Sequence, residues 1–366
     1  MEIPFLLFDK SNPGIKAEML TAFEKVYDSQ WYIMGESLLS FEKKYAAFSG
    51  VKYCSGVANG LDAIIISLKT LNIGPGDEVI VPSNTYIATW LAVSSVGAKP
   101  VPVEPLKDTY NIDPGLIESA ITPATRAVIP VHLYGQACEM DKIMAVAAKH
   151  NLFVVEDNAQ AHGALFNNKP TGSFGNINAT SFYPGKNFGA LGDGGAVTTD
   201  DHSLYEQANI TRNYGSDKKY HNQVKGVNSR LDELQAAFLE VKLNYINDWN
   251  KERNRIAALY KEQLTGIGDI VLPAIAPGCT SVYHVFMIRT EKRNELQQHL
   301  LKMGINTLIH YPIPPHLQQA YKDSMYKRND FPIAEHIAGT CLSLPIYPGL
   351  TNTQINYICD NIRLFY

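Results

Sequence analysis

Short apolar runs and amphipathic stretches alternate through the first half of the chain. The runs rich in β-branched residues lie at 53–57, 78–81, 99–103, 127–131 and 152–156. Helical spacing of apolar residues recurs between them, at 61–71, 84–96, 114–120 and 140–149. This alternation predicts βαβ units, and therefore an α/β fold with a mostly parallel central sheet flanked by helices. Ligands of such sheets bind beyond the carboxyl ends of the strands.

The pattern changes after residue 200. A helix is predicted at 201–212, a polar segment follows, and a long charged helix is predicted at 230–264. Beyond a Pro- and Gly-containing segment, the chain has an apolar run at 283–289 and helical patterns at 291–303, 333–338 and 351–364. Helices are also predicted before the first strand, at 16–28 and 38–48. We expect a large α/β domain at 1–245, which includes this N-terminal lead-in, and a smaller α+β domain at 246–366.

Composition argues against several classes of function. The 366 residues are 45% hydrophobic and 19% charged, which is ordinary for a globular protein. A net charge of -4 without a long basic run argues against nucleic acid as a partner. No stretch reaches the roughly 20 apolar residues of a membrane span. Five scattered cysteines without a CxxC pair, and histidines without an HExxH motif, predict a cytoplasmic protein without a metal site.

The stretch at 180–198 places one lysine among glycines. It reads TSFYPGKNFGALGDGGAVT, with Lys186 between Gly185 and Asn187. Glycine permits positive φ angles and lets the backbone come close to a bound molecule. A desolvated lysine amine loses its proton near neutral pH and forms a Schiff base with an aldehyde. Taken alone, the stretch fits a plain turn beside a surface lysine equally well.

Other positions would complete a site for pyridoxal phosphate. Asp157 follows a buried strand, where a carboxylate would keep a pyridine nitrogen protonated, although a helix cap is an equal alternative. Gly60 and Leu61 open a helix after a strand, so their free N–H groups would hold a phosphate, with a hydroxyl from Ser181. Tyr86 would lie flat on a ring, or fill the core. The Walker motif fails, and no GxGxxG follows the first strand, which disfavours ATP and NAD.

Five motifs together resemble those of the sugar aminotransferases of the DegT/DnrJ/EryC1/StrS family. They are ANGLDA at 58–63, PSNTY at 82–86, EDNAQA at 156–161, SFYPGKNFGALGDGGA at 181–196 and NSRLDELQA at 228–236. The resemblance spans nearly the whole chain and implies a pyridoxal phosphate enzyme of the aspartate aminotransferase fold (fold type I). FYPGKN and PSNTYIATW look most similar to enzymes that aminate C3 of a dTDP-linked 3-keto-6-deoxyhexose. Phe188 departs from the pattern, since leucine is frequent there.

The resemblance implies a role for each candidate position. It makes Lys186 the Schiff-base lysine, Asp157 the partner of the pyridine nitrogen and Gln160 a contact to the ring hydroxyl. Tyr86 would stack on the ring, and Asn228 would reach the phosphate of the neighbouring subunit's cofactor, which implies a homodimer with shared active sites. The phosphate would be held by Gly60, Leu61 and Ser181. The candidates for binding the nucleotide-sugar are Tyr183, Lys219, Tyr220, Arg230 and His310.

The resemblance also implies a reaction in two halves. L-Glutamate would leave as 2-oxoglutarate, and the cofactor, now pyridoxamine phosphate, would aminate a keto-sugar to a dTDP-3-amino-3,6-dideoxyhexose. One alternative is a C4 aminotransferase acting on a nucleotide 4-keto-sugar. Another is a pyridoxal phosphate-binding regulatory paralogue without turnover. Relatives that dehydrate the sugar carry histidine at the position of Lys186, which disfavours that reaction here.

Overall fold

The centre of the protein is a seven-stranded sheet, seen in a computed structural model that describes residues 1–8 and 14–366. The strand order is β1-β9-β8-β5-β4-β2-β3. The strands are β1 (Tyr53–Val57), β2 (Glu78–Pro82), β3 (Lys99–Val103), β4 (Thr125–Val128), β5 (Phe153–Asp157), β8 (Ile177–Ser181) and β9 (Gly195–Thr199). All neighbours pair in parallel except β9, which is antiparallel to both β1 and β8. The predicted α/β fold with a mostly parallel sheet is confirmed.

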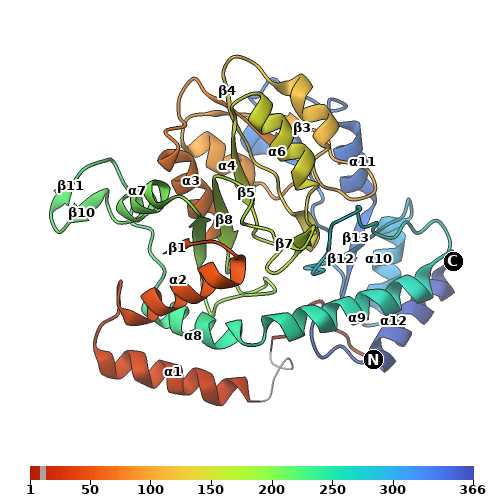
Figure 1. The fold of residues 1–366 in the computed structure, drawn as a ribbon. Coiled ribbons are helices and arrows are strands. Elements are labelled where there is room, and N and C mark those ends of the chain that lie inside the picture. The colour runs from red at the N-terminus through yellow and green to blue at the C-terminus, as the bar shows by residue number, and fades with distance from the viewer. Residues whose placement is uncertain (9–13) are drawn as a thin grey trace.

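Helices cover both faces of this sheet (Figure 1). They are α1 (Ile15–Ser29), α2 (Glu36–Ser49), α3 (Gly60–Thr70), α4 (Ala88–Ser95), α5 (Pro114–Ile117), α6 (Met140–Lys149), α7 (His202–Arg212), α8 (Glu233–Leu243), α9 (Ile246–Leu264), α10 (Arg293–Lys302), α11 (Pro332–Thr340) and α12 (Asn352–Phe365). α3, α4 and α7 pack on the face that buries Val79 and Val81, whereas α5 and α6 pack on the face that buries Ile80. Because both faces are covered, the strands β2, β4 and β5 carry apolar residues on both sides and read as nearly continuous apolar runs.

The last third of the chain packs around a core of its own. Its two strands, β12 (Phe286–Arg289) and β13 (Cys341–Leu344), pair antiparallel. The helices α9, α10 and α12 bury apolar side chains in this core. Ile3 belongs to the same core and pairs with Ile305, so the N-terminal residues lie beside the C-terminal helices (Figure 1). Two short hairpins complete the strands: β6 (Leu165–Phe166) with β7 (Lys169–Pro170), and β10 (Ser216–Lys218) with β11 (His221–Asn222).

Three predicted elements need correction. The helix predicted at 230–264 is two helices, because the N–H groups of Asn244 and Tyr245 bond only three residues back and end α8. The helix predicted at 84–96 begins at Ala88, and the residues before it form a loop. The strand predicted at 127–131 ends at Val128, shortly before Pro130, which has no N–H to donate to a sheet.

The strands β8 and β9 lie outside the predicted elements. Their sequences, INATS and GAVTT, are small and polar, yet all ten residues are buried. The polar side chains find partners inside the protein: Asn178 Nδ2 and Thr198 Oγ1 both donate to the carbonyl of Gly172, over 2.9 and 2.8 Å. Buried polar groups with such partners leave no apolar pattern by which a strand is recognised.

Candidate active site

Lys186 lies on the loop that joins two adjacent central strands. β8 ends at Ser181 and β9 begins at Gly195, and these two residues pair across the sheet. The N–H of Phe182 donates to the carbonyl of Gly194 over 2.7 Å, which closes the base of the loop. The lysine is therefore held at one end of the sheet, where parallel α/β folds bind ligands.

The glycines of this loop allow close packing of the protein's own backbone. A Cβ atom on Gly189 would lie 2.3 Å from the carbonyl oxygen of Pro184, and one on Gly195 would lie 2.5 Å from the backbone of Asn59. Across residues 185–195, all of them described, no glycine has a positive φ. These glycines therefore do not use the positive φ angles that their residue type permits, and the close approach seen in the structure is to the chain itself.

Lys186 is half-buried, and its amine lies in a poorly solvated environment. Desolvation lowers the pKa of Lys186 to about 8, against the opposing effect of the negative charge on Asp157. Burial lowers the pKa of His162 to about 3 and that of His310 to about 4, and the positive charge of Lys186 adds to both shifts. The two imidazoles are therefore neutral, and the amine of Lys186 is partly deprotonated near neutral pH, which is the state of a nucleophile and general base.

Asp157 is the last residue of β5 and is fixed at both backbone and side chain. Its N–H donates to Pro130 O over 2.8 Å, and its carbonyl accepts from His132 N over 3.1 Å. Its Oδ1 accepts from the N–H of Ala159 (3.1 Å) and its Oδ2 from the hydroxyl of Thr89 (2.9 Å). Burial raises the pKa of Asp157, and these two hydrogen bonds and Lys186 act in the opposite direction.

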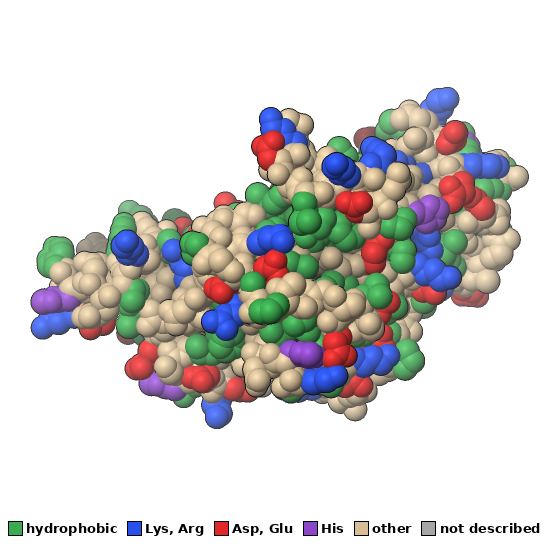
Figure 2. All heavy atoms as spheres, turned by 90° about the horizontal axis from the view of Figure 1, so that it is seen from above, with side chains coloured by type: hydrophobic (Ala, Val, Ile, Leu, Met, Phe, Trp, Pro, Cys, Tyr) green, Lys and Arg blue, Asp and Glu red, His purple; other side chains and the backbone are tan. Residues whose placement is uncertain are grey.

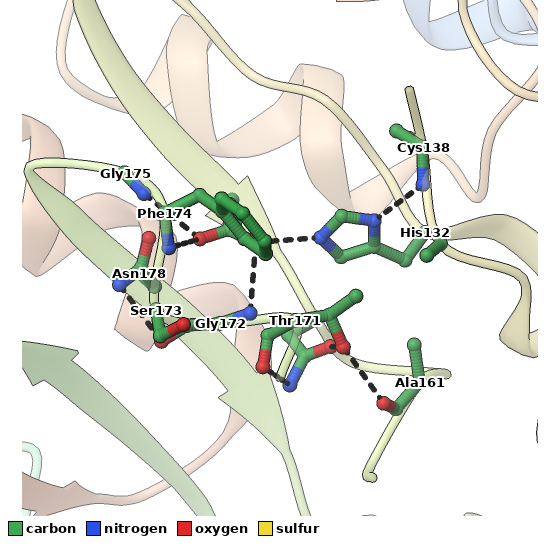
Figure 3. A network of polar contacts seen from close by, with 12 residues as sticks. His132, Cys138, Ala161, Thr171, Gly172, Ser173, Phe174, Gly175 and Asn178 are labelled. Atoms are coloured by element: carbon green, nitrogen blue, oxygen red, sulfur yellow. Dashed lines mark hydrogen bonds and ion pairs between the residues drawn. The ribbon is translucent and has the colours of Figure 1, made fainter. Parts of the chain in front are cut away.

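A second buried carboxylate, Glu156, lies on the opposite face of β5. Its Oε2 is 2.7 Å from His132 Nε2 and accepts from Gly172 N (2.8 Å). Its Oε1 accepts from the N–H groups of Phe174 (2.5 Å) and Gly175 (2.8 Å). Figure 3 shows Gly172, Phe174 and Gly175 on one side of the imidazole of His132 and Cys138 on the other.

The contacts of His132 define its tautomer. The N–H of Cys138 donates to His132 Nδ1 over 3.0 Å, so the imidazole proton is assigned to Nε2 and points at Glu156. Burial opposes the charge of Glu156, but its hydrogen bonds outweigh burial and lower its pKa. Sequence reasoning missed this pair, although a glutamate inside the apolar run LFVVE was a visible signal.

Gln160 is oriented by two tyrosines. Its Oε1 accepts from the N–H of Tyr134 over 2.6 Å, and its Nε2 donates to the hydroxyl of Tyr311 over 3.0 Å. The Tyr134 hydroxyl in turn donates to the carbonyl of His310. Tyr311, from the C-terminal third of the chain, was missed by sequence reasoning because no local pattern connects it to Gln160.

Tyr86 stands on the loop before α4 with 52% of its surface exposed. Its ring centroid lies 5.2 Å from that of Tyr311, at an interplanar angle of 40°. It is therefore no core tyrosine, and its face is available to a ligand. His310 lies next to Tyr311 in the chain and is held by a 2.9 Å contact between its Nδ1 and Ser343 Oγ.

The first turn of α3 lies against the end of β8. Asn59 caps the helix by accepting from the N–H of Asp62 over 2.8 Å. The first N–H group to donate within the helix is that of Ala63, which donates to the carbonyl of Asn59. The N–H groups of Gly60 and Leu61 precede it and are therefore available to an anion. A Cβ atom on Gly60 would lie 2.5 Å from Ser181 Cβ. The three residues predicted to hold a phosphate are thus brought together.

Asn228 and Arg230 lie on a segment that touches the same helix start. The hydroxyl of Ser229 accepts from Ala58 N over 3.1 Å. The side chain of Asn228 is exposed, while Arg230 Nη1 donates to Asn213 Oδ1 over 3.1 Å.

The remaining candidates differ in position. Tyr183 is exposed and lies three residues before Lys186 on the same loop. Lys219 and Tyr220 lie at the tip of the β10–β11 hairpin, which projects away from the sheet (Figure 1). Tyr220 is 87% exposed, with Lys219 Nζ 5.3 Å from its ring centroid. The structure does not bring these two residues to the lysine of their own chain.

The described residues show no cluster of histidine, cysteine or acidic side chains that could hold a metal ion. Among them, no helix is long and apolar enough to cross a membrane. Basic and acidic side chains are interspersed on the face shown in Figure 2.

The donor set fits the groups of pyridoxal phosphate. An amine with a lowered pKa suits an aldehyde, and a buried carboxylate suits a ring nitrogen that must stay protonated. An amide fixed by two tyrosines suits a ring hydroxyl, and free N–H groups at a helix start suit a phosphate.

Known proteins resemble the chain over its full length. A transaminase from Aneurinibacillus thermoaerophilus, named for dTDP-3-amino-3,6-dideoxy-alpha-D-galactopyranose, is 50% identical over 99% of this chain and 99% of its own. The crystal structure of DesV from Streptomyces venezuelae superposes with a TM-score of 0.98 at 48% identity, covering 100% of this chain and 98% of the other.

The cofactor is seen in another relative. NtdA from Bacillus subtilis, solved with bound PMP, gives a TM-score of 0.92 at 31% identity over 100% of this chain and 85% of its own. A profile of the DegT/DnrJ/EryC1/StrS aminotransferase family matches residues 13–363. The chain therefore belongs to the DegT/DnrJ/EryC1/StrS aminotransferase family and is a pyridoxal phosphate-dependent enzyme.

Proposed function

We propose that this aminotransferase moves the amino group of L-glutamate to C3 of a dTDP-3-keto-6-deoxyhexose, giving a dTDP-3-amino-3,6-dideoxyhexose and 2-oxoglutarate. The observation that carries the chemistry is the amine of Lys186, whose pKa lies near 8, acting with the buried carboxylate of Asp157. The choice of sugar is supported by the name of the 50% identical relative.

We assign the cofactor contacts as follows. Lys186 binds the aldehyde carbon, Asp157 the ring nitrogen, Gln160 the ring hydroxyl and Tyr86 the ring face. The phosphate is held by Gly60, Leu61 and Ser181, and by Asn228 of a second subunit. When bound, the cofactor withdraws electrons from the carbon that loses a proton.

The catalytic work of the chain is proton transfer by Lys186. With the cofactor bound, its Nζ would move the proton from Cα of the donor to C4′ of the cofactor, and in the second half it would return a proton from C4′ to C3 of the sugar. A pKa near 8 suits both directions, because the neutral and protonated amines are both populated near neutral pH. Asp157, whose two oxygens are held by Ala159 N and the Thr89 hydroxyl, would accept the hydrogen bond of the protonated ring nitrogen.

The diphosphate of the nucleotide-sugar requires cationic partners. We assign this role to Lys219 and Arg230, with Tyr183, Tyr220 and His310 around the sugar. Since the β10–β11 hairpin projects from its own chain, its residues would serve the active site of a partner (Figure 1).

We therefore propose a homodimer with shared active sites. Support comes from the apolar side chains exposed on and after α1: Leu20, Phe23, Tyr27, Trp31 and Ile33. A second copy would remove such a patch from water. We also propose a cytoplasmic location, since all five cysteines are free and buried.

We propose the domain boundary between residues 245 and 246. The break between α8 and α9 falls there, and the C-terminal third has a separate core. Because α9 itself packs into that core, the second domain would begin with this helix.

The second half-reaction, run against a panel of dTDP- and UDP-linked keto-sugars, tests the proposed substrate. Mapping the product by NMR identifies the carbon that receives the amino group. We expect amination of C3 on a dTDP-linked sugar. Amination at C4, or preference for a UDP-linked sugar, would overturn the assignment, and no amination of any sugar would favour a regulatory paralogue.

A further inference from the structure

Two buried threonines form a chain of hydroxyl groups behind Asp157. Thr85 and Thr89 are 3% and 1% exposed, and their Oγ1 atoms lie 3.0 Å apart. Thr89 Oγ1 lies 2.9 Å from Asp157 Oδ2. An ionised carboxylate only accepts hydrogen bonds, so Thr89 donates to Asp157 and accepts from Thr85. Each hydrogen bond in such a chain polarises the next.

Thr89 also contacts the loop that carries Tyr86. Its N–H donates to the carbonyl of Tyr86 over 3.2 Å, one turn before it in the chain. One residue thus holds the backbone of the tyrosine assigned to the ring face and the side chain of the aspartate assigned to the ring nitrogen. These two groups are fixed relative to each other before a ligand arrives.

We propose that Thr89, supported by Thr85, is a positioning residue that keeps Asp157 ionised and aimed at the ring nitrogen of the cofactor. The inference rests on the role proposed above for Asp157. Among the described residues, the carboxylate has two direct hydrogen-bond donors, Ala159 N and the Thr89 hydroxyl, and only the second is a side chain.

Other titratable groups act on Asp157 from a distance. Lys186 and His132 favour its charged form, and the negative charge of Asp157 adds to the effect of burial in raising the pKa of Tyr311 and of Cys138. None of these four has a side-chain hydrogen bond to the carboxylate among those described. Thr89 is therefore the side chain whose removal changes the direct contacts of Asp157 and leaves the surrounding charges in place.

Removal of the Thr89 hydroxyl is expected to change the position of the proton between Asp157 and the ring nitrogen. Without the Thr89 hydroxyl, the buried carboxylate becomes more basic and draws the proton from the ring nitrogen toward itself. An unprotonated ring accepts electrons less well. We expect Thr89→Val to slow the donor half-reaction about tenfold to a hundredfold, with little change in the donor concentration for half-saturation.

The test compares four variants of the holoenzyme. Thr89→Val removes the hydroxyl at constant shape, Thr89→Ser keeps it, and Thr85→Val removes the supporting group. Thr70→Val is the matched control, because the buried Thr70 Oγ1 has no hydrogen-bond partner among the described residues. The readout is nitrogen-15 NMR of holoenzyme prepared with ring-labelled pyridoxal phosphate, which reports the protonation of the ring nitrogen directly.

We expect a protonated ring nitrogen in the wild type, Thr89→Ser and Thr70→Val. The Thr89→Val signal should move toward the unprotonated position at neutral pH, with Thr85→Val intermediate. Equal signals in Thr89→Val and Thr70→Val would overturn the proposal. An unprotonated ring in the wild type would overturn it together with the role of Asp157, but not the choice of sugar. If Thr89→Val does not fold, Thr85→Val decides by the same comparison with Thr70→Val.

Discussion

Replacing Glu156, the second buried carboxylate of β5, measures how much this side chain contributes to the stability of the protein. In Glu156→Gln the side chain keeps its size, but one of its two oxygens becomes an NH₂ group. Each oxygen of Glu156 faces two donors. Nε2 of His132 cannot become an acceptor, because the imidazole proton would then have to lie on Nδ1, which already accepts from Cys138 N. Two N–H groups therefore lose their acceptor whichever way the amide is placed.

The magnitude follows from these two donors. A buried donor without a partner costs about 1–3 kcal/mol, so the variant should lose about 2–6 kcal/mol of unfolding free energy. That is a large share of the roughly 5–15 kcal/mol that stabilises a typical protein. Urea titration followed by circular dichroism measures the loss. The control is Glu118→Gln at an exposed glutamate beside Lys149 and His150, where we expect little change.

The same variant predicts a pH dependence. The pKa of Glu156 is lower in the folded protein than the unfolded value of about 4.3. The contribution of its charge to the free energy of unfolding is therefore fully present above about pH 4.3, and it is lost as the pH falls through the folded pKa. The stability difference between wild type and Glu156→Gln should therefore shrink below about pH 4.3. An unfolding midpoint equal to that of Glu118→Gln at neutral pH would refute the reasoning.

Three further results are expected. Pyridoxal phosphate can be trapped on the protein with borohydride and the labelled lysine mapped by mass spectrometry. Labelling of Lys186 should be half-maximal near pH 8, because the neutral amine reacts. A midpoint near pH 10 would contradict the desolvation of this amine. Lys219→Ala should weaken binding of the nucleotide-sugar but leave the glutamate half-reaction nearly untouched, and equal losses would refute its assignment. Gly60→Ala should raise the dissociation constant of the cofactor about fivefold to a hundredfold, because its Cβ would meet Ser181 at 2.5 Å. Gly192→Ala, whose Cβ would meet only the flexible end of Gln235, should not.

The sheet could be predicted where its strands are apolar and not where they are polar. The strands β1, β2, β4 and β5 are mostly buried, whereas β3 at the edge of the sheet is partly exposed, and the apolar composition of all five identifies them. β8 and β9 are completely buried, but they contain the polar residues Asn178, Thr180 and Thr198. The hydrogen-bond partners of these side chains lie outside the two strands. The reversal of β9, which creates the loop carrying Lys186, was therefore invisible to a pattern of apolar residues.

The reactive groups of the candidate site could be predicted from the sequence, but the residues that set their charge could not. A lysine, a carboxylate and a helix start can be recognised in the sequence by residue type and by their place after a strand. Thr89 does not, because its partner Asp157 is 68 residues away. The same holds for His132, which meets Glu156 across 24 residues. The sequence identifies which groups can react, whereas their charge is set by partners that only the folded chain brings together. A chain with all five motifs but valine at position 89 would thus keep its reactive lysine and lose the hydroxyl that holds Asp157.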